Sequence, residues 1–277
     1  MKKTNLLLFA LSVIALGATA QTDSTSKSGT EKPRTGKTDS IRIGNILIIQ
    51  NEESDSSRTK SGKKTTKTYS VNWFTIDLGF SNFSDKTNYA QTEADGLTGA
   101  GVGEEQMTLR TGKSVNINLW FYEQRFDIVK KRLSVKYSVG VELNNYRFRE
   151  NVVFEKSPNR IVMDPTKHYS KNKLATDYVT VPVVLSYNFT PHSKHKVALS
   201  AGASVGYLYS ARQKTITAED GKNKVRDDFN LRPFKISYVG ELALGPLKFY
   251  GSYATQSIFR KGLDITPYNV GLRFGGL

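Results

Sequence analysis

The stretch "DYVTVPVVLSYNF", residues Asp177 to Phe189, decides the fold of this chain. Its apolar residues fall on one parity, and they are Val181, Val183, Leu185, Tyr187 and Phe189. Strict alternation over this length predicts a β-strand with one apolar and one polar face. Pro182 interrupts the pattern, because proline cannot donate to a β-ladder and belongs on edges, first positions or bulges. The fold must therefore explain how a paired strand accommodates Pro182.

Seven further segments repeat this alternation. They cover residues 71–80, 113–122, 132–148, 195–210, 232–244, 246–259 and 267–276. Short connections near 127–132, 190–195 and 245–246 alternate with longer, mostly polar ones at 81–112, 148–174, 211–230 and 260–266. This pattern is typical of a barrel meander with short periplasmic turns and longer outer loops. We therefore expect an all-β fold, an eight-stranded antiparallel transmembrane β-barrel over residues 71–277, located in the cell outer membrane.

The two faces of the strands differ in composition. The polar parity is rich in Gly, Ser, Ala and Asn, which suit the interior of a small barrel. It also carries isolated charges, namely Asp77, Lys136, Glu142, Lys235, Glu241, Lys248 and Arg273. Because their signs are mixed, we expect lumen ion pairs that plug the barrel rather than an ion pathway. The apolar parity then faces lipid, with aromatic girdles at the strand ends. Pro182 shares the lumen parity, so a bulge or a lumen group should compensate for it.

The first 70 residues have a different composition. Residues 1–20 combine a positive start, an apolar run and an Ala18-Thr19-Ala20 cleavage site, which is the pattern of an export signal peptide. Residues 21–70 are rich in Ser, Thr, Lys and Gly, and we expect a disordered, flexible periplasmic extension. Within it, residues 41–50 form a strand-like island with no neighbouring strand within easy reach. The chain contains no cysteine, which excludes disulfides, a lipid-anchored cysteine and Cys-based metal sites.

Part of the sequence is similar to a known family. The segment "YVTVPVVLSYNF" resembles a strand motif of the Bacteroidetes outer-membrane β-barrel family that includes PorT-type proteins. The resemblance covers residues 71–277, including "VALSAGASVGYLYSARQ" and the closing "YNVGLRF". The segment "DSIRIGNILII" resembles the periplasmic stretch that often precedes such barrels. The resemblance implies an outer-membrane barrel of the cell envelope, and some PorT-type barrels take part in type IX protein secretion.

Few residues could carry chemistry. The histidines are His168, His192 and His195. The last two share one short turn without a nearby carboxylate or cysteine, so a solvated turn is a simpler interpretation than a metal site. His168 lies in a long loop near Asp164, Ser170 and Asp177, which leaves an outer-leaflet lipid-modifying enzyme as an alternative, although no nucleophile motif supports it. We expect no enzyme activity, no catalytic, cofactor-binding or metal-binding residues, and no cofactor.

The expected partners follow from charge and from the island. The net charge is +15, and for an exported chain we expect outer-membrane lipids and lipopolysaccharide phosphates as partners rather than nucleic acid. Solvated loop and tail residues are the alternative source of this charge. Residues 41–50 could add a strand to a periplasmic protein partner or fold onto the barrel's own rim. We expect a structural or protein-interaction role, such as an accessory of a secretion or envelope assembly; a narrow pore for small solutes is a further alternative.

Overall fold

The structure, a computed structural model, describes residues 39–43, 46–50, 69–129, 132–193 and 196–275. The chain divides into two units, Met1–Lys63 and Lys64–Leu277. The expected export signal at 1–20 and most of the expected flexible extension at 21–70 lie outside the described residues and stay predictions. No helix within the described ranges is long and apolar enough to cross a membrane.

The first unit contains a hairpin. Strands β1 (Asp39–Ile43) and β2 (Ile46–Gln50) pair antiparallel, with Ile43 opposite Ile46. The sequence pattern predicts one unpaired strand over 41–50, and this prediction is wrong, because two short strands pair with each other. Gly44 and Asn45 separate them, and Gly-Asn between apolar runs is a two-residue hairpin signal. A two-stranded sheet still has two outer edges at which another strand can pair.

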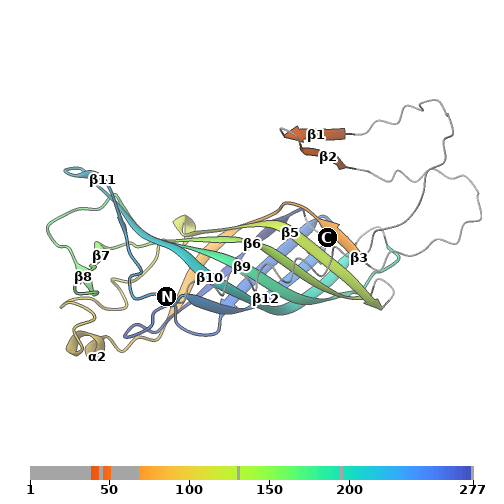
Figure 1. The fold of residues 1–277 in the computed structure, drawn as a ribbon. Coiled ribbons are helices and arrows are strands. Elements are labelled where there is room, and N and C mark those ends of the chain that lie inside the picture. The colour runs from red at the N-terminus through yellow and green to blue at the C-terminus, as the bar shows by residue number, and fades with distance from the viewer. Residues whose placement is uncertain (1–38, 44–45, 51–68, 130–131, 194–195, 276–277) are drawn as a thin grey trace, which may run out of the picture. The chain divides into compact units, whose positions relative to one another are not determined.

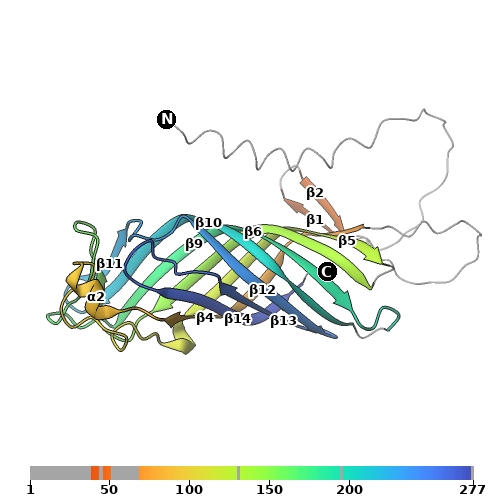
Figure 2. The same ribbon diagram turned by 90° about the horizontal axis from the view of Figure 1, so that it is seen from below.

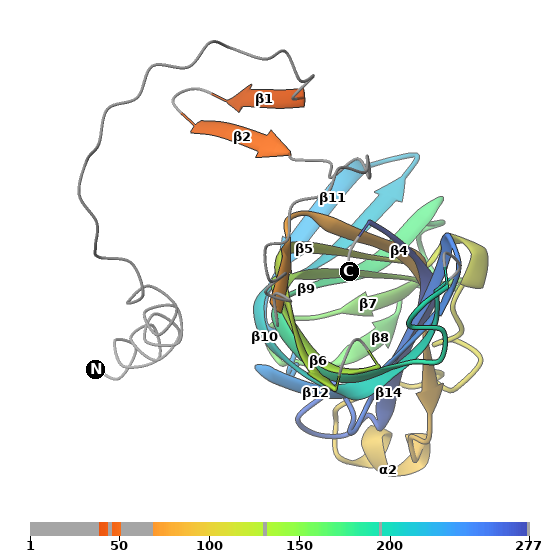
Figure 3. The same ribbon diagram turned by 90° about the vertical axis from the view of Figure 1, so that its right-hand side faces the viewer.

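The second unit contains a closed barrel of eight antiparallel strands (Figure 1). In chain order they are β4 (Thr75–Asp85), β5 (Val115–Val129), β6 (Leu133–Arg147), β9 (Lys171–Asn188), β10 (Val197–Thr217), β12 (Phe234–Leu244), β13 (Leu247–Ala254) and β14 (Ile265–Phe274). Each pairs with the next, and β14 returns to β4, which closes the ring seen along the barrel in Figure 3. The predicted fold class is confirmed.

The connections alternate in length as the sequence predicts. The short turns β5–β6, β9–β10 and β12–β13 lie at one end of the barrel, and the long loops lie at the other (Figures 1 and 2). The long loops carry α2 (Tyr89–Ala94), the 3-10 turn η1 (Thr111–Lys113), β7 (Val152–Phe154), β8 (Ile161–Met163) and β11 (Gly221–Arg226). At the short-turn end, β3 (Tyr69–Asn72) pairs with the far part of β5. The long-loop end is therefore the outer end of the barrel.

Strand β9 accommodates Pro182 without a change of register. Pro182 is buried on the lumen face, as its parity predicts, and it pairs regularly with Ser204 of β10. On the other side, the ladder to β6 skips the two positions where Pro182 and Val181 would face Ser138 and Val139, and it resumes in the same register. There is no bulge at Pro182; register shifts lie in β5, at Trp120/Tyr122 and Asp127/Val129, and in β10, at Leu208/Ser210. A gap in one ladder thus compensates for the missing N–H of the proline.

The outward face of the barrel is apolar. Its exposed residues include Ile76, Leu78, Phe80, Val181, Val183, Leu185, Leu199, Val205, Ile236, Leu242, Val270 and Leu272. Near the short turns, Trp73 packs edge-on against Tyr122 and Phe74 against Phe121, with ring centroids 5.2 and 6.4 Å apart. This is the lipid-facing band with an aromatic girdle that the alternation predicts.

The long loops form a hydrophobic cap at the outer end of the barrel. The buried residues of this outer cap are Val102, Met107, Leu109, Tyr146, Phe148, Val152, Phe154, Ile161, Leu174, Ala211, Phe229, Leu231, Ile258, Phe259, Leu263 and Ile265. Phe154 lies among three aromatic rings, with centroids 5.6 Å from Phe148, 5.7 Å from Phe229 and 6.4 Å from Phe259. The loops were expected to be mostly polar, but their scattered apolar residues meet in this second core.

Candidate functional site

The charges predicted to face the lumen all lie inside the barrel wall. Asp77 is 0% exposed, Lys136 4%, and Glu142, Lys235 and Arg273 are each 6% exposed. The side chain of Glu241 is 12% exposed. Lys248 lies close to the short-turn end, where its Nζ donates to the carbonyl oxygen of Gly275 at 2.9 Å. Glu123, which the parity pattern did not include, is 1% exposed and lies beside Lys136. We call the group formed by Asp77, Glu123, Lys136, Glu241 and Arg273 the lumen ion cluster.

Arg273 forms the centre of the lumen ion cluster. Its Nε and Nη2 donate to the two carboxylate oxygens of Asp77 at 2.7 and 2.9 Å. The pairing of β14 with β4 places these two residues directly opposite each other. Asp77 also accepts from the indole Nε1 of Trp120 at 2.7 Å and from the amide of Asn118 at 3.1 Å. Bidentate charge-assisted bonds of this kind are the strong ones, and here both carboxylate oxygens have partners.

Glu241 joins Arg273 to a second cation. One of its carboxylate oxygens accepts from Nη1 of Arg273, and the other accepts from Nζ of Lys136. Glu123 lies 3.6 Å from Nζ of Lys136 and 3.7 Å from Nη1 of Arg273. Three carboxylates and two cations from β4, β5, β6, β12 and β14 therefore meet in one buried group.

A second buried pair lies next to this group. The carboxylate of Glu142 on β6 accepts from Nζ of Lys235 on β12. Glu142 also accepts from the amide groups of Asn144 at 3.0 Å and Asn269 at 3.2 Å. Nζ of Lys235 lies 4.4 Å from the ring centroid of Tyr178, a cation–π distance. Each charge thus has several partners, as buried charges require.

Amides and hydroxyls continue the network towards the outer end. The amide of Asn116 donates to Asn118 and to Asn144, both at 2.9 Å, and the hydroxyl of Tyr250 donates to Asn116. Ser81 donates to Asn269 at 2.7 Å. These small polar residues lie on the inward parity, and they fill the lumen between the charges and the outer cap.

This filling decides whether water can pass through the lumen. A water-filled channel leaves its lining accessible, whereas Asp77 and Glu123 are 0% and 1% exposed. An eight-stranded barrel is just wide enough for its side chains to fill. At the level of Arg273, neighbouring side chains therefore pack around Asp77 and Glu123, as expected of a filled lumen rather than of a water-filled channel.

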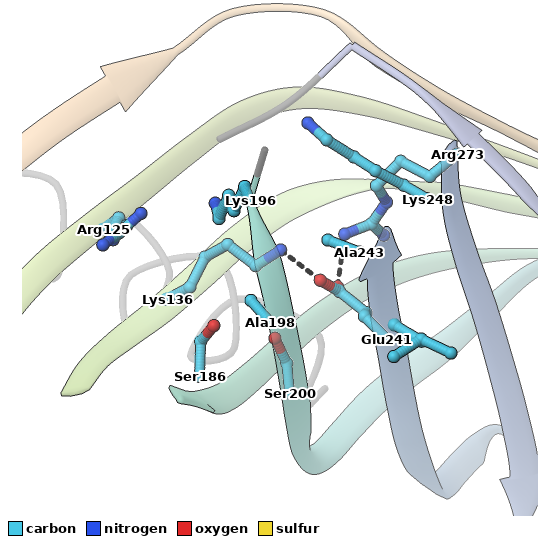
Figure 4. Close-up of a pocket in the computed structure, with 11 residues that line it drawn as sticks. Arg125, Lys136, Ser186, Lys196, Ala198, Ser200, Glu241, Ala243, Lys248 and Arg273 are labelled. Carbon is cyan, nitrogen blue, oxygen red and sulfur yellow. Dashed lines mark hydrogen bonds and ion pairs between the residues drawn. The ribbon is translucent and has the colours of Figure 1, made fainter. Parts of the chain in front are cut away.

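A small cavity opens on the short-turn side of the lumen ion cluster. Its volume is ≈ 20 Å³, and Figure 4 shows Lys136 and Arg273 converging on Glu241 beside it. Arg125, Lys196 and Lys248 also line this cavity. Burial, followed by the charges of Arg125 and Lys248, lowers the pKa of Lys196 to about 8. Three basic side chains therefore lie at the periplasmic mouth of the barrel, where Arg125 is paired with Asp127.

The sequence pattern missed Glu123 for a local reason. The bulge in β5 between Trp120 and Tyr122 shifts the register by one residue, so Glu123 faces the lumen although its parity in the first half of β5 predicts the outward face. The sequence signal for an inward Glu123 is a charged residue that directly follows three consecutive aromatic residues, 120–122. Trp120 lies before the bulge on the inward parity of Asn116 and Asn118, and its indole N–H donates to Asp77; alternation predicts the face but not this partner.

The loop residues considered for an enzyme have other partners. His168 is exposed in its loop. The hydroxyl of Ser170 donates to the carbonyl of Ile216, and Asp177 pairs with Arg212. Asp164 accepts from the hydroxyl of Thr166, which lowers the pKa of Asp164.

The remaining histidines lie in the β9–β10 connection. His192 is exposed there, and His195 lies outside the described residues. The described part of the chain contains no group of three or more His, Cys, Asp or Glu side chains placed to hold a metal ion.

A family model agrees with this architecture. A family model, the outer membrane protein beta-barrel domain, matches residues 72–258, more than half of the chain. Comparison with curated proteins gives no match. Two crystal structures of Ail, the attachment invasion locus protein of Yersinia pestis, are similar to the chain. The complex with the heparin analogue sucrose octasulfate is 11% identical, has a TM-score of 0.31, and the match covers 73% of this chain and 97% of that chain. The second structure is 12% identical, has a TM-score of 0.31, and the match covers 76% of this chain and 100% of that chain.

The chain belongs to the outer membrane protein beta-barrel domain family, and it is a protein of the outer membrane.

Proposed function

We propose that this protein is a non-conducting, non-enzymatic outer-membrane barrel with a structural or protein-interaction role, as an accessory of a secretion or envelope assembly. The observation that carries the proposal is the lumen ion cluster, in which Arg273 and Lys136 are paired with Asp77, Glu123 and Glu241. A barrel whose interior is occupied in this way has no room for a solute pathway, so its surfaces, loops and extension are the parts that can interact with partners.

The outer cap supports the same proposal. Apolar residues from the long loops close the outer end, with Val152 and Leu231 each 0% exposed. A buried apolar core stabilises one loop arrangement, since each fully buried large side chain contributes about 1.5–3 kcal/mol. Folded loops form a defined external surface, which suits recognition by a partner.

The periplasmic side supports an assembly role. The strand motif around Pro182 resembles PorT-type barrels of Bacteroidetes, and some of these take part in type IX secretion. The β1–β2 hairpin keeps two outer edges of backbone, and strand addition to such an edge is a common mode of peptide recognition. In this proposal, residues 41–50 dock a periplasmic protein through the hairpin.

Affinity purification from native outer membranes tests this role. The intact protein is compared with a variant that lacks residues 38–52 and with a control that lacks residues 23–37, a deletion of equal length. A stoichiometric partner should be present with the intact protein and the control, and it should be lost with the 38–52 deletion. If no partner is found with any of the three, or if the partner persists without residues 38–52, the docking proposal is wrong.

The enzymatic alternative has its own test. It requires His168, so His168→Ala would change the lipid A or phospholipid profile of the outer membrane. We expect the profile to be the same with the wild-type protein and the variant, as measured by mass spectrometry of extracted lipids. A lipid modification that depends on His168 would contradict the non-enzymatic proposal.

A further inference from the structure

A second charged surface lies on the outside of the barrel. Near the outer end, β6, β9, β10 and β11 form a four-stranded sheet that extends past the lipid-facing band (Figure 1). Its outward positions hold eight cations, which we call the outer basic face: Arg147, Lys171, Lys173, Arg212, Lys214, Lys222, Lys224 and Arg226. The alternate positions, such as Leu174 and Gln213, are buried towards the cap, which fixes the outward direction of the cations.

The cations lie in rows across the strands. Arg147 is opposite Lys173, Lys173 is opposite Lys214, and Lys214 is opposite Lys224, so four adjacent strands contribute four cations to one row. Neighbouring strands are about 4.8 Å apart. In the next row, Arg212 is opposite Arg226. Like charges at directly opposite positions destabilise a sheet.

Few acidic groups balance the outer basic face. In the described part of the chain, Arg212 is the single member that makes an ion pair, with Asp177. At the tip of the β10–β11 hairpin, Asp220 is paired with Lys167, and beyond β11, Asp228 is paired with Arg260. Asp227 follows Arg226 and accepts from the backbone N–H of Asp228. The outer basic face therefore keeps a large excess of positive charge.

The cations also act on one another. The charge of Lys222 lowers the pKa of Lys214, and the charge of Arg226 lowers the pKa of Lys224. Both shifts show that the protonated forms repel each other. An anion placed between them would relieve this repulsion.

The position of the outer basic face relative to the membrane indicates the source of the anion. On β10, the exposed residues Val205, Tyr207 and Tyr209 lead up to it, and Tyr207 packs against Phe234 with ring centroids 5.3 Å apart. Aromatic residues of this kind mark the membrane–water interface. Arg212 lies three residues beyond Tyr209, a rise of about 10 Å along the strand. The outer basic face therefore begins at the level of the outer-leaflet headgroups.

We propose that the outer basic face binds the phosphate groups of lipopolysaccharide in the outer leaflet. Rows of cations one strand apart match closely spaced phosphates on a lipid surface, and a lateral position on the barrel wall keeps them against that surface. The site shares no residue with the β1–β2 hairpin or with the lumen ion cluster, so the proposal goes beyond the proposed assembly role and can succeed or fail independently of it.

The test uses the full-length folded protein and three variants. The disruptive variant is Lys173→Gln/Lys214→Gln/Lys224→Gln, and the conservative variant has arginine at the same positions. The control is Lys86→Gln/Lys113→Gln/Lys261→Gln, which removes the same charge from exposed lysines of the other outer loops. Heat-modifiable migration on gels establishes that all four barrels are folded. Affinity is measured for micelles that contain phosphorylated lipid A, dephosphorylated lipid A or phosphatidylglycerol, and for soluble polyphosphate.

We expect the wild-type protein, the arginine variant and the control to bind phosphorylated lipid A with similar affinity. The disruptive variant should bind about 100-fold more weakly, because each cation near an anionic membrane contributes roughly a factor of five. Binding of the wild-type protein should weaken strongly when the lipid A phosphates are removed. Equal affinities of the disruptive and control variants would overturn the proposal. So would tighter binding of soluble polyphosphate or of phosphatidylglycerol than of lipid A, which would assign the surface to a different anion.

Discussion

At the scale of single residues, the lumen depends on Arg273. One guanidinium group contacts Asp77, Glu241 and Glu123, so its loss would remove a cation from the middle of three buried carboxylates. Removing one partner from a buried ion pair costs more than the pair contributes, because an uncompensated charge remains. Arg273 therefore determines the stability of the barrel interior.

Arg273→Met is expected to lower the free energy of unfolding by about 3–5 kcal/mol, since it keeps much of the volume and removes the charge. The matched control is Arg260→Met, which breaks an exposed pair with Asp228 at 3.5 Å and should cost less than about 1 kcal/mol. Urea titration of the folded barrels in detergent, with the folded fraction read from migration on unheated gels, measures the free energy of unfolding of both variants. A similar midpoint for the two variants would show that Arg273 has no special role.

Single residues also show how much of the lumen the sequence could predict. Alternation placed Asp77, Lys136 and Arg273 in the lumen because the side-chain period of a strand is two. It could not pair them, since Asp77 and Arg273 come from the first and last barrel strands and meet only when the ring closes. Glu123 was missed because a bulge shifts the register by one residue, and a bulge has no strong local sequence signal.

At the scale of elements, glycine controls how closely β4, β13 and β14 approach. Gly79 and Gly271 lie opposite each other, and Tyr250 of β13 lies over them inside the lumen. A Cβ on Gly271 would lie 2.5 Å from Cα of Gly79 and 2.7 Å from Cε1 of Tyr250. The strand pair that closes the barrel thus requires glycine here.

Gly271→Ala is expected to destabilise the barrel by at least about 1–3 kcal/mol, because the methyl group overlaps backbone atoms that cannot move aside. Gly240→Ala is the matched control, since a Cβ there would lie 3.9 Å from the Ser200 carbonyl oxygen, an ordinary van der Waals contact. Thermal melting of the folded species on gels separates the two variants. Equal melting temperatures would contradict this account of barrel closure.

Phe154→Ala tests the outer cap. The substitution removes a ring that packs against Phe148, Phe229 and Phe259, and truncation of a buried Phe costs about 3–5 kcal/mol. We expect trypsin added to intact cells to cleave the long loops faster, while the membrane-embedded barrel keeps its folded migration. Val153→Ala, at the adjacent and less buried position, is the control and should be cleaved like the wild-type protein. Unchanged cleavage of Phe154→Ala would show that the cap does not order the loops.

The elements that the sequence did not predict lie mainly at the outer end. The β10–β11 hairpin was placed in a loop at 211–230, although Asp220-Gly221 is a known turn dipeptide. The cap could not be predicted because its apolar residues come from four loops without any common period. Periodicity detects strands, whereas contacts between irregular segments depend on the three-dimensional arrangement.

At the scale of the whole molecule, closure and filling act together. The ring of eight strands has no free edge in the membrane, which satisfies the backbone in lipid. The lumen ion cluster fills the interior near the periplasmic end, and the outer cap covers the other end. This arrangement supports the proposal of a sealed barrel whose exposed parts, rather than its interior, are available to partners.

Single-channel recording in planar bilayers shows whether the barrel is sealed. The purified wild-type barrel should give no conductance steps, because Arg273 and its carboxylate partners fill the lumen. Arg273→Gln and Glu241→Gln are recorded in parallel to detect whether conductance depends on the cluster. Reproducible steps in the wild-type protein that change in size in either variant would show that the lumen is a pore, and the account of a sealed barrel would be wrong.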